Sequence, residues 1–372
     1  MKNLFISTCF VIVFLIACTP LAATKSTSSK ITLTPPIIYT LQPTVAPIFT
    51  PGKTLNHATT ATVVPPSLGQ IAFVSSHKGK YAVYTINADG TALTKLTDDM
   101  TVVMNPHWSP KGKQIMFSAC LEGEGECSGA FDIFIMNDDG SKLVNVTNDP
   151  AEDMQPSWSP DGNRFVFSSD RSGNFEIYSM AVDGTHLLQL TNSTTANTNP
   201  QWSSDGSWIA YESQRILDNG GWYYEICVVS SDGTKTLQLA EGVMPYWSPD
   251  SKFIAFNSND IFVIKPDGTG LKNLSNSKFD EFDFSWSPDS KFIAFVTNRD
   301  SNAEIYTVCI DCEKNPQVNI SNSPANDQHP SWSPDGTKIV FLSDESVCVM
   351  NVDGSQKECF NIKALGTVDW KP

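Results

Sequence analysis

The feature that most constrains this chain is a short tryptophan motif that recurs along its length. The motif reads Trp-Ser-(Pro/Ser)-(Asp/Lys)-(Gly/Ser), and it begins at Trp108, Trp158, Trp202, Trp247, Trp286 and Trp332. A seventh tryptophan, Trp370, starts the same motif in the final residues VDWKP. Successive tryptophans lie 38 to 50 residues apart. This spacing is typical of the four-stranded blades of a β-propeller.

Each repeat contains short apolar runs in the same order. After the tryptophan turn comes a run such as residues 115–117, and after a polar loop comes a second run such as residues 133–136. An Asp-Gly turn then leads to a third run that ends in Leu-Thr or a variant of it. Runs of β-forming residues separated by such turns predict antiparallel hairpins. We therefore expect an all-β fold with no helix after residue 69.

The two ends of the repeat region complement each other. Residues 69–97 provide three strands of a unit without the tryptophan strand that precedes them elsewhere. Residues 367–370 provide a tryptophan strand with no further strands after it. We predict that these segments form one blade and close a ring of seven blades, with the C-terminal strand innermost.

The repeat at residues 155–191, QPSWSPDGNRFVFSSDRSGNFEIYSMAVDGTHLLQLT, resembles the TolB-type, WD40-like β-propeller repeat. The resemblance extends over residues 69–372 and implies a propeller. Similar blades occur in Tol-system proteins, in prolyl-oligopeptidase-type peptidases and in oligogalacturonate lyases, so the resemblance leaves the function open. TolB itself has six blades after an α/β domain, whereas this chain has seven units after a different kind of segment.

The N-terminal segment indicates that the protein is exported and anchored to a membrane. Residues 1–17 contain Lys2 and an apolar run of signal-peptide length, too short to span a membrane. The sequence LIAC at residues 15–18 resembles a bacterial lipobox, which implies that Cys18 carries a lipid; an ordinary secretory signal is the alternative. Residues 18–68 are rich in Thr, Pro and Ser, and we expect them to form a disordered tether.

The charge of the chain limits its partners. The net charge is −15, and every acidic residue follows residue 68. An acidic surface argues against nucleic acid and anionic lipid as partners of the propeller itself, because both need a basic face. We expect a monomer.

The candidate ligand residues come from equivalent positions in the repeats. In the geometry that the resemblance implies, the loop before each tryptophan strand faces the central channel. The residues three before each tryptophan would form a ring: Asn105, Gln155, Asn199, Met244, Asp283, His329 and Thr367. The acids five before a tryptophan are Asp153, Glu281 and Asp327. Different polar residues at equivalent positions suit a specific ligand site, although variable loops would look the same.

One loop stands out by its length. Residues 213–226 are several residues longer than the matching segment that starts at Ser169, and they include Trp222. An exposed Trp222 would stack on a sugar or anchor a peptide; the alternative is that it covers the blade edge. Arg171 and Arg299 recur in similar loops, and we interpret both as residues that fix the loops.

Enzymatic motifs are missing from the sequence. It contains no Gly-x-Ser-x-Gly, no His-Glu-x-x-His and no phosphate-binding glycine loop. A lyase like the oligogalacturonate lyases would need a metal held by His77, His107 and His329. The acids Asp280, Glu281 and Asp283 lack the spacing of an EF-hand. We therefore expect no cofactor and no metal.

The cysteines indicate an oxidising compartment. Three local pairs are predicted to form disulfides, namely Cys120–Cys127, Cys309–Cys312 and Cys348–Cys359, and Cys227 has no local partner. Taken together, the sequence predicts a membrane-anchored, extracytoplasmic propeller that binds a protein or glycan partner without catalysis. A polysaccharide lyase and a purely structural envelope protein are the alternatives.

Overall fold

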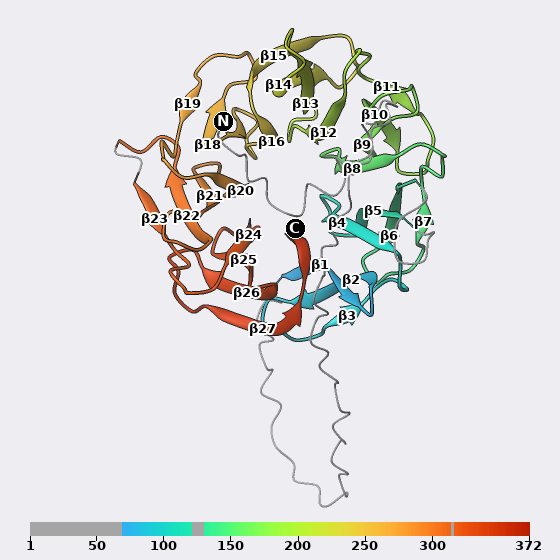
Figure 1. Ribbon diagram of the computed structural model, residues 1–372. Helices are drawn as coiled ribbons and strands as arrows, with labels where there is room; N and C mark the ends of the chain where they lie inside the picture. The colour runs from blue at the N-terminus through green and yellow to red at the C-terminus, as the bar shows by residue number, and fades with distance from the viewer. Residues whose placement is uncertain (1–68, 121–129, 314–315) are drawn as a thin grey trace, which may run out of the picture. The chain divides into compact units, whose positions relative to one another are not determined.

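The structure is a computed structural model, and it describes residues 69–120, 130–313 and 316–372. Regular structure within these ranges consists of seven four-stranded antiparallel sheets arranged as a ring (Figure 1). The described residues contain no helix with the length and apolar character that a membrane crossing requires. The predicted all-β, seven-bladed propeller is confirmed.

Each blade places one strand at the centre of the ring and three strands outward (Figure 1). Blade 1 consists of β28 (Leu365–Trp370), β1 (Gln70–His77), β2 (Lys80–Asn87) and β3 (Thr94–Lys95). Blade 2 consists of β4 (Val102–Trp108), β5 (Gln114–Cys120), β6 (Asp132–Asn137) and β7 (Val144–Asn145). Blade 3 consists of β8 (Asp153–Trp158), β9 (Arg164–Ser169), β10 (Glu176–Ala181) and β11 (Leu188–Gln189). Blade 4 consists of β12 (Asn197–Trp202), β13 (Trp208–Ile216), β14 (Trp222–Ser230) and β15 (Thr236–Glu241).

The remaining blades have the same order. Blade 5 consists of β16 (Val243–Trp247), β17 (Ile254–Ser258), β18 (Asp260–Ile264) and β19 (Lys272–Asn273). Blade 6 consists of β20 (Glu281–Trp286), β21 (Phe292–Thr297), β22 (Glu304–Cys309) and β23 (Gln317–Asn319). Blade 7 consists of β24 (Asp327–Trp332), β25 (Lys338–Ser343), β26 (Ser346–Asn351) and β27 (Glu358–Lys363).

The repeat tryptophans join neighbouring blades. Five of the seven are buried, and Trp202 and Trp332 are partly buried. In four blades the indole Nε1–H donates to a backbone carbonyl of the preceding blade, next to that blade's own tryptophan. These bonds run from Trp158 to His107, Trp247 to Gln201, Trp286 to Tyr246, and Trp370 to Ser331. The motif thus provides both packing surface and a hydrogen bond between blades.

The C-terminal strand completes the first blade, as predicted. It begins at Leu365, two residues earlier than expected, and pairs with β1 so that Trp370 lies opposite Ile71 and Val368 opposite Phe73. The Lys371 N–H then donates to the Gln70 carbonyl at 2.8 Å. The two ends of the propeller are therefore held together by strand pairing.

Two of the predicted disulfides are present. Cys309 and Cys312 have Cα atoms 5.5 Å apart, and Cys348 and Cys359 have Cα atoms 4.0 Å apart across the β26–β27 hairpin. The third pair, Cys120–Cys127, lies partly outside the described residues, because Cys127 falls within residues 121–129. The predicted signal peptide (residues 1–17), Cys18 and the tether (residues 18–68) also lie outside them.

Candidate functional site

A β-bulge interrupts the innermost strand of every blade shortly before its tryptophan. In six blades the bulge contains a residue other than glycine in the left-handed region, with φ between 40° and 57°. These six residues are Asn105, Gln155, Asn199, Met244, Asp283 and His329. In blade 1 the left-handed residue is Gly366, and Thr367 follows it. Six of the predicted ring residues therefore share one backbone position, and in blade 1 the left-handed position lies one residue earlier, at Gly366.

The left-handed backbone carries a conformational cost at six of the seven ring positions, all except Thr367. Such a conformation destabilises a residue other than glycine by about 1–3 kcal/mol, and it is found disproportionately at functional sites. All seven ring residues are partly buried on strands that surround the centre of the ring (Figure 1). The blades thus present seven side chains, six of them from the same left-handed position, with amide, thioether, carboxylate, imidazole and hydroxyl chemistry.

Hydrogen bonds link ring residues of blades 3, 4 and 5. The Gln155 Oε1 accepts the Asn199 N–H at 3.0 Å, and the Asn199 side-chain amide donates to Glu212 at 2.8 Å. Glu212, a buried residue of β13, also accepts the Met244 N–H at 2.7 Å. Burial raises the pKa of the Glu212 carboxyl, and these hydrogen bonds oppose that effect. The sequence did not predict Glu212 as a site residue, because the candidates were taken from the positions just before each tryptophan and Glu212 lies on the second strand of its blade.

A contact between a histidine and a carboxylate occupies the sector between blades 6 and 7. The His329 Nδ1 lies 3.2 Å from the Asp283 Oδ2, and both side chains are mostly buried. Burial raises the pKa of Asp283, while the nearby His329 favours its charged form. Tyr246 of blade 5 is 38% exposed, and desolvation of its phenol, together with Asp283 and Glu212, raises its pKa to about 12. Its hydroxyl is protonated at neutral pH and can donate a hydrogen bond.

The histidines named by the lyase alternative have separate environments. His107 lies 3.9 Å from Asp369 on β28, whereas His329 faces Asp283. His77 is the exposed last residue of β1. Across the residues that the structure describes, no group of three His, Cys, Asp or Glu side chains is arranged to hold a metal ion.

The three acids five residues before a tryptophan differ from the ring residues. Their side chains have no exposed surface, and each forms an ion pair within its own blade. The cation also lies over an aromatic ring of that blade. The pairs are Asp153–Arg171, Glu281–Arg299 and Asp327–Lys357. Each carboxylate is buried and already paired with the cation of its own blade, so these acids lie in the blade interior and are not free to bind a ligand in the channel.

The long loop of blade 4 is a hairpin that exposes apolar side chains. Trp222 is 56% exposed and contacts Tyr224 edge to face, with ring centroids 5.5 Å apart. Ile216, which lies opposite Trp222 in the strand register, is also exposed. Trp222 therefore has free surface for a partner, whereas a residue that covered the blade edge would be buried.

The family comparison agrees with this architecture. A family model named TolB beta propeller domain matches residues 124–220 and 213–365, which together span about two thirds of the chain. The Tol-Pal system protein TolB of Geobacter metallireducens is 40% identical over 50 residues, which are 13% of this chain and 12% of that protein. The chain therefore matches about one eighth of the length of this curated relative.

Two solved structures have a similar fold. TolB from Acinetobacter baumannii matches with a TM-score of 0.54 and 19% identity over 84% of this chain and 69% of that chain. An oligogalacturonate lyase in complex with manganese matches with a TM-score of 0.58 and 13% identity over 79% of this chain and 85% of that chain. At these identities the likeness concerns the fold alone.

Proposed function

Because the chain belongs to the TolB beta propeller domain family, we propose that it works outside the cytoplasm as a non-catalytic binding platform. The family supports a binding or scaffold role, and the two disulfides suit an oxidising compartment. The observation that carries the proposal is the ring of different side chains at the bulges of the seven innermost strands. A fold that needed the bulge alone would not need a carboxylate, an imidazole and amides there.

The proposed partner is a protein that contacts the channel face. Asn105, Gln155 and Asn199 would offer amides, and the Asp283–His329 pair would offer charge. Trp222 would add an apolar anchor, since large exposed aromatic residues contribute strongly to protein interfaces. Trp222 is also the observation that favours a glycan as the second candidate, because sugars stack on exposed aromatic rings.

The two other functions have weaker support. A metal-dependent polysaccharide lyase would need clustered ligands, and His107 and His329 each face a separate carboxylate. A purely structural envelope protein would not need exposed apolar side chains at a hairpin tip, such as Ile216 and Trp222. Either function would be consistent with a capture experiment in which no partner protein is enriched.

We expect the full-length chain to capture a partner protein from an extract of its native envelope. The double variant His329→Ala/Trp222→Ala should retain about one tenth of the captured partner or less, as expected when central anchor residues are removed. Lys252→Ala, in an exposed turn, is the matched control and should capture normally. Capture is measured by quantitative mass spectrometry. Absence of any enriched protein, or equal capture by all three proteins, would contradict the proposal.

We also propose that residues 1–17 are a signal peptide, that Cys18 is lipidated and that residues 18–68 tether the propeller to a bacterial membrane. A fatty-acid analogue fed to cells should label the native chain and partition it into the detergent phase. Cys18→Ala should abolish the label and leave the chain in the aqueous phase. A labelled Cys18→Ala protein, or an unlabelled native protein, would refute lipidation at this residue.

A further inference from the structure

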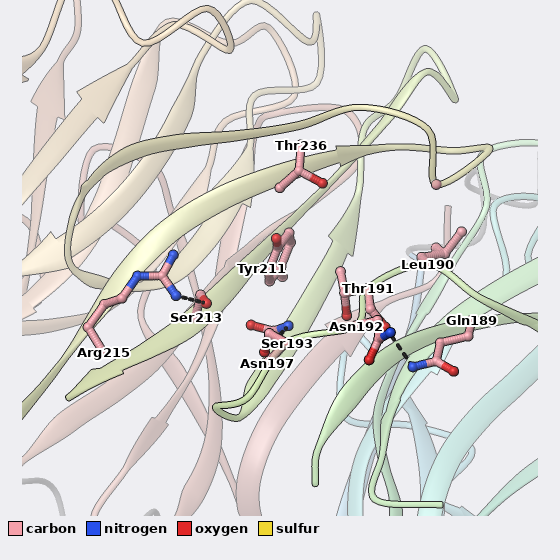
Figure 2. Close-up of a pocket in the computed structure, with 11 residues that line it drawn as sticks. Gln189, Leu190, Thr191, Asn192, Ser193, Asn197, Tyr211, Ser213, Arg215 and Thr236 are labelled. Carbon is pink, nitrogen blue, oxygen red and sulfur yellow. Dashed lines mark hydrogen bonds between the residues drawn. The ribbon is translucent and has the colours of Figure 1, made fainter. Parts of the chain in front are cut away.

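A cavity of about 600 Å³ lies between blades 3 and 4, and no ring residue lines it. The end of β11, the loop after it, β13 and the start of β15 line the cavity (Figure 2). Nine of its eleven lining residues have a hydroxyl, amide or guanidinium group. The volume falls within the range of small-molecule sites. We name it the inter-blade cavity.

A small side chain behind the lining of the inter-blade cavity distinguishes blade 4 from two other blades. In blade 3, Phe167 pairs with Tyr178, and in blade 6 Phe295 pairs with Tyr306. At the same register position of blade 4, Tyr211 pairs with Cys227. A thiol is far smaller than a phenol ring, and Cys227 is next to two lining residues, opposite Tyr211 and with its Sγ 3.8 Å from Arg215 Nη2, so less side-chain volume lies beside the cavity in blade 4. Burial raises the pKa of the Cys227 thiol to about 11, which makes it unreactive at neutral pH.

A second difference concerns a buried acid. Asp153 in blade 3 and Glu281 in blade 6 each form an ion pair with an arginine of the neighbouring strand's loop. That arginine lies two residues after the residue that is directly opposite the acid in the sheet. In blade 4 an amide, Asn197, stands at the position of the acid, and Arg215 stands at the position of the arginine. The Arg215 Nε instead donates to Glu225 at 2.7 Å, and its Nη1 donates to the Ser213 Oγ (Figure 2).

Asn197 is left with an unsatisfied acceptor. It is 2% exposed, and its amide nitrogen donates to Glu176 and to the Ser193 hydroxyl. Its Oδ1 has no hydrogen-bond partner within the described part of the chain. An unsatisfied buried acceptor is destabilising. Because Asn197 lines the cavity, a donor on a ligand would satisfy it. Arg215, on the facing strand, contributes donors to the same cavity.

From these observations we propose that the inter-blade cavity binds a neutral carbohydrate. A sugar hydroxyl both donates and accepts, so neighbouring hydroxyls would donate to Asn197 Oδ1 and accept from the Arg215 guanidinium. Glu225 balances the charge of Arg215, so the cavity does not demand a charged ligand. A peptide would need apolar surface for its side chains, and Leu190 is the one aliphatic lining residue. This site is independent of the partner proposed for the channel face.

The test uses the full-length chain on an array of neutral and N-acetylated oligosaccharides, with uronic-acid oligosaccharides and peptides as further probes. The native chain should bind at least one neutral or N-acetylated oligosaccharide. Asn197→Asp/Cys227→Tyr, which restores the residues of blade 3 and fills the cavity, should weaken that binding at least tenfold. Arg215→Ala, which removes the donors without filling the cavity, should weaken it similarly.

Asn219→Asp is the matched control, because it makes the same chemical change at an exposed position and keeps the acceptor for the Gly221 N–H. This variant should bind like the native chain. Thermal melts identify any variant that fails to fold. If Asn197→Asp/Cys227→Tyr does not fold, the binding of Arg215→Ala tests the proposal. The proposal is overturned if the native chain binds no neutral or N-acetylated oligosaccharide, if it binds uronic acids or peptides instead, or if the folded cavity variants bind equally well.

Discussion

Deletion of residues 366–372 is expected to destabilise the propeller more than any single surface substitution. The deletion removes most of β28, which is the innermost strand of blade 1. It also removes the bond from Trp370 Nε1 to the Ser331 carbonyl (2.9 Å) and the bond from the Trp108 N–H to Asp369 (2.8 Å). These bonds connect blade 1 to blades 7 and 2, so all three blades lose contacts.

The magnitude follows from the burial of Trp370. Its side chain is 5% exposed, and loss of a buried tryptophan costs about 3–5 kcal/mol before the strand pairing is counted. Denaturant unfolding monitored by circular dichroism measures the effect. Trp370→Ala should show a large part of the loss, whereas Trp222→Ala at the exposed hairpin should change the free energy of unfolding by about 0.5 kcal/mol or less. A truncated protein that unfolds like the intact one would contradict closure by β28.

Closure could be predicted because the repeat has strong local signals. The tryptophan recurs with a blade-length period, and its turn has residues with defined backbone preferences. The strands that remain at the two ends of the repeat region are three at residues 69–97 and one at residues 367–370, and together they make one blade. Side-chain alternation does not locate a bulge, so the left-handed backbone at the ring positions and the start of β28 at Leu365 required the structure.

The buried ion pairs show the limit of the sequence. Asp153 and Arg171 are 18 residues apart, and the sequence does not reveal that both side chains turn into the blade. The interpretation of Arg171 as a loop-fixing residue agrees with the structure, whereas the acid was assigned to the ligand ring. The inter-blade cavity had a readable signal, because Asn197 and Cys227 depart from an acid and an aromatic residue at the matching positions of blades 3 and 6.

Arg171→Met is expected to lower the free energy of unfolding by about 3–5 kcal/mol at neutral pH, because it leaves a buried carboxylate without its cation. The Arg171 Nη2 lies 2.8 Å and 3.0 Å from the two Asp153 oxygens, and the acid has no exposed surface. The guanidinium also lies over the Phe167 and Tyr178 rings, with centroid distances of 5.4 Å and 5.2 Å. Methionine keeps most of the packing of the aliphatic part of the arginine side chain and removes its charge.

The matched substitution in blade 4 separates the buried charge from other effects. Arg215 has Asn197 where blade 3 has Asp153, and its partner Glu225 is partly exposed. Arg215→Met should therefore cost about 1 kcal/mol or less. The double variant Asp153→Asn/Arg171→Met removes both charges and should recover most of the stability lost in Arg171→Met.

The loss in Arg171→Met should also depend on pH in a defined direction. Burial already raises the pKa of Asp153 above its value in the unfolded chain, and removal of Arg171 raises it further. The native state then binds a proton at a higher pH than the unfolded state, so stability rises as the pH falls through the raised pKa toward about 4. Urea unfolding at a series of pH values should show the deficit of Arg171→Met relative to the native protein shrinking over that interval. A deficit that is constant with pH, or as large in Arg215→Met, would mean that the buried Asp153 charge is not its cause.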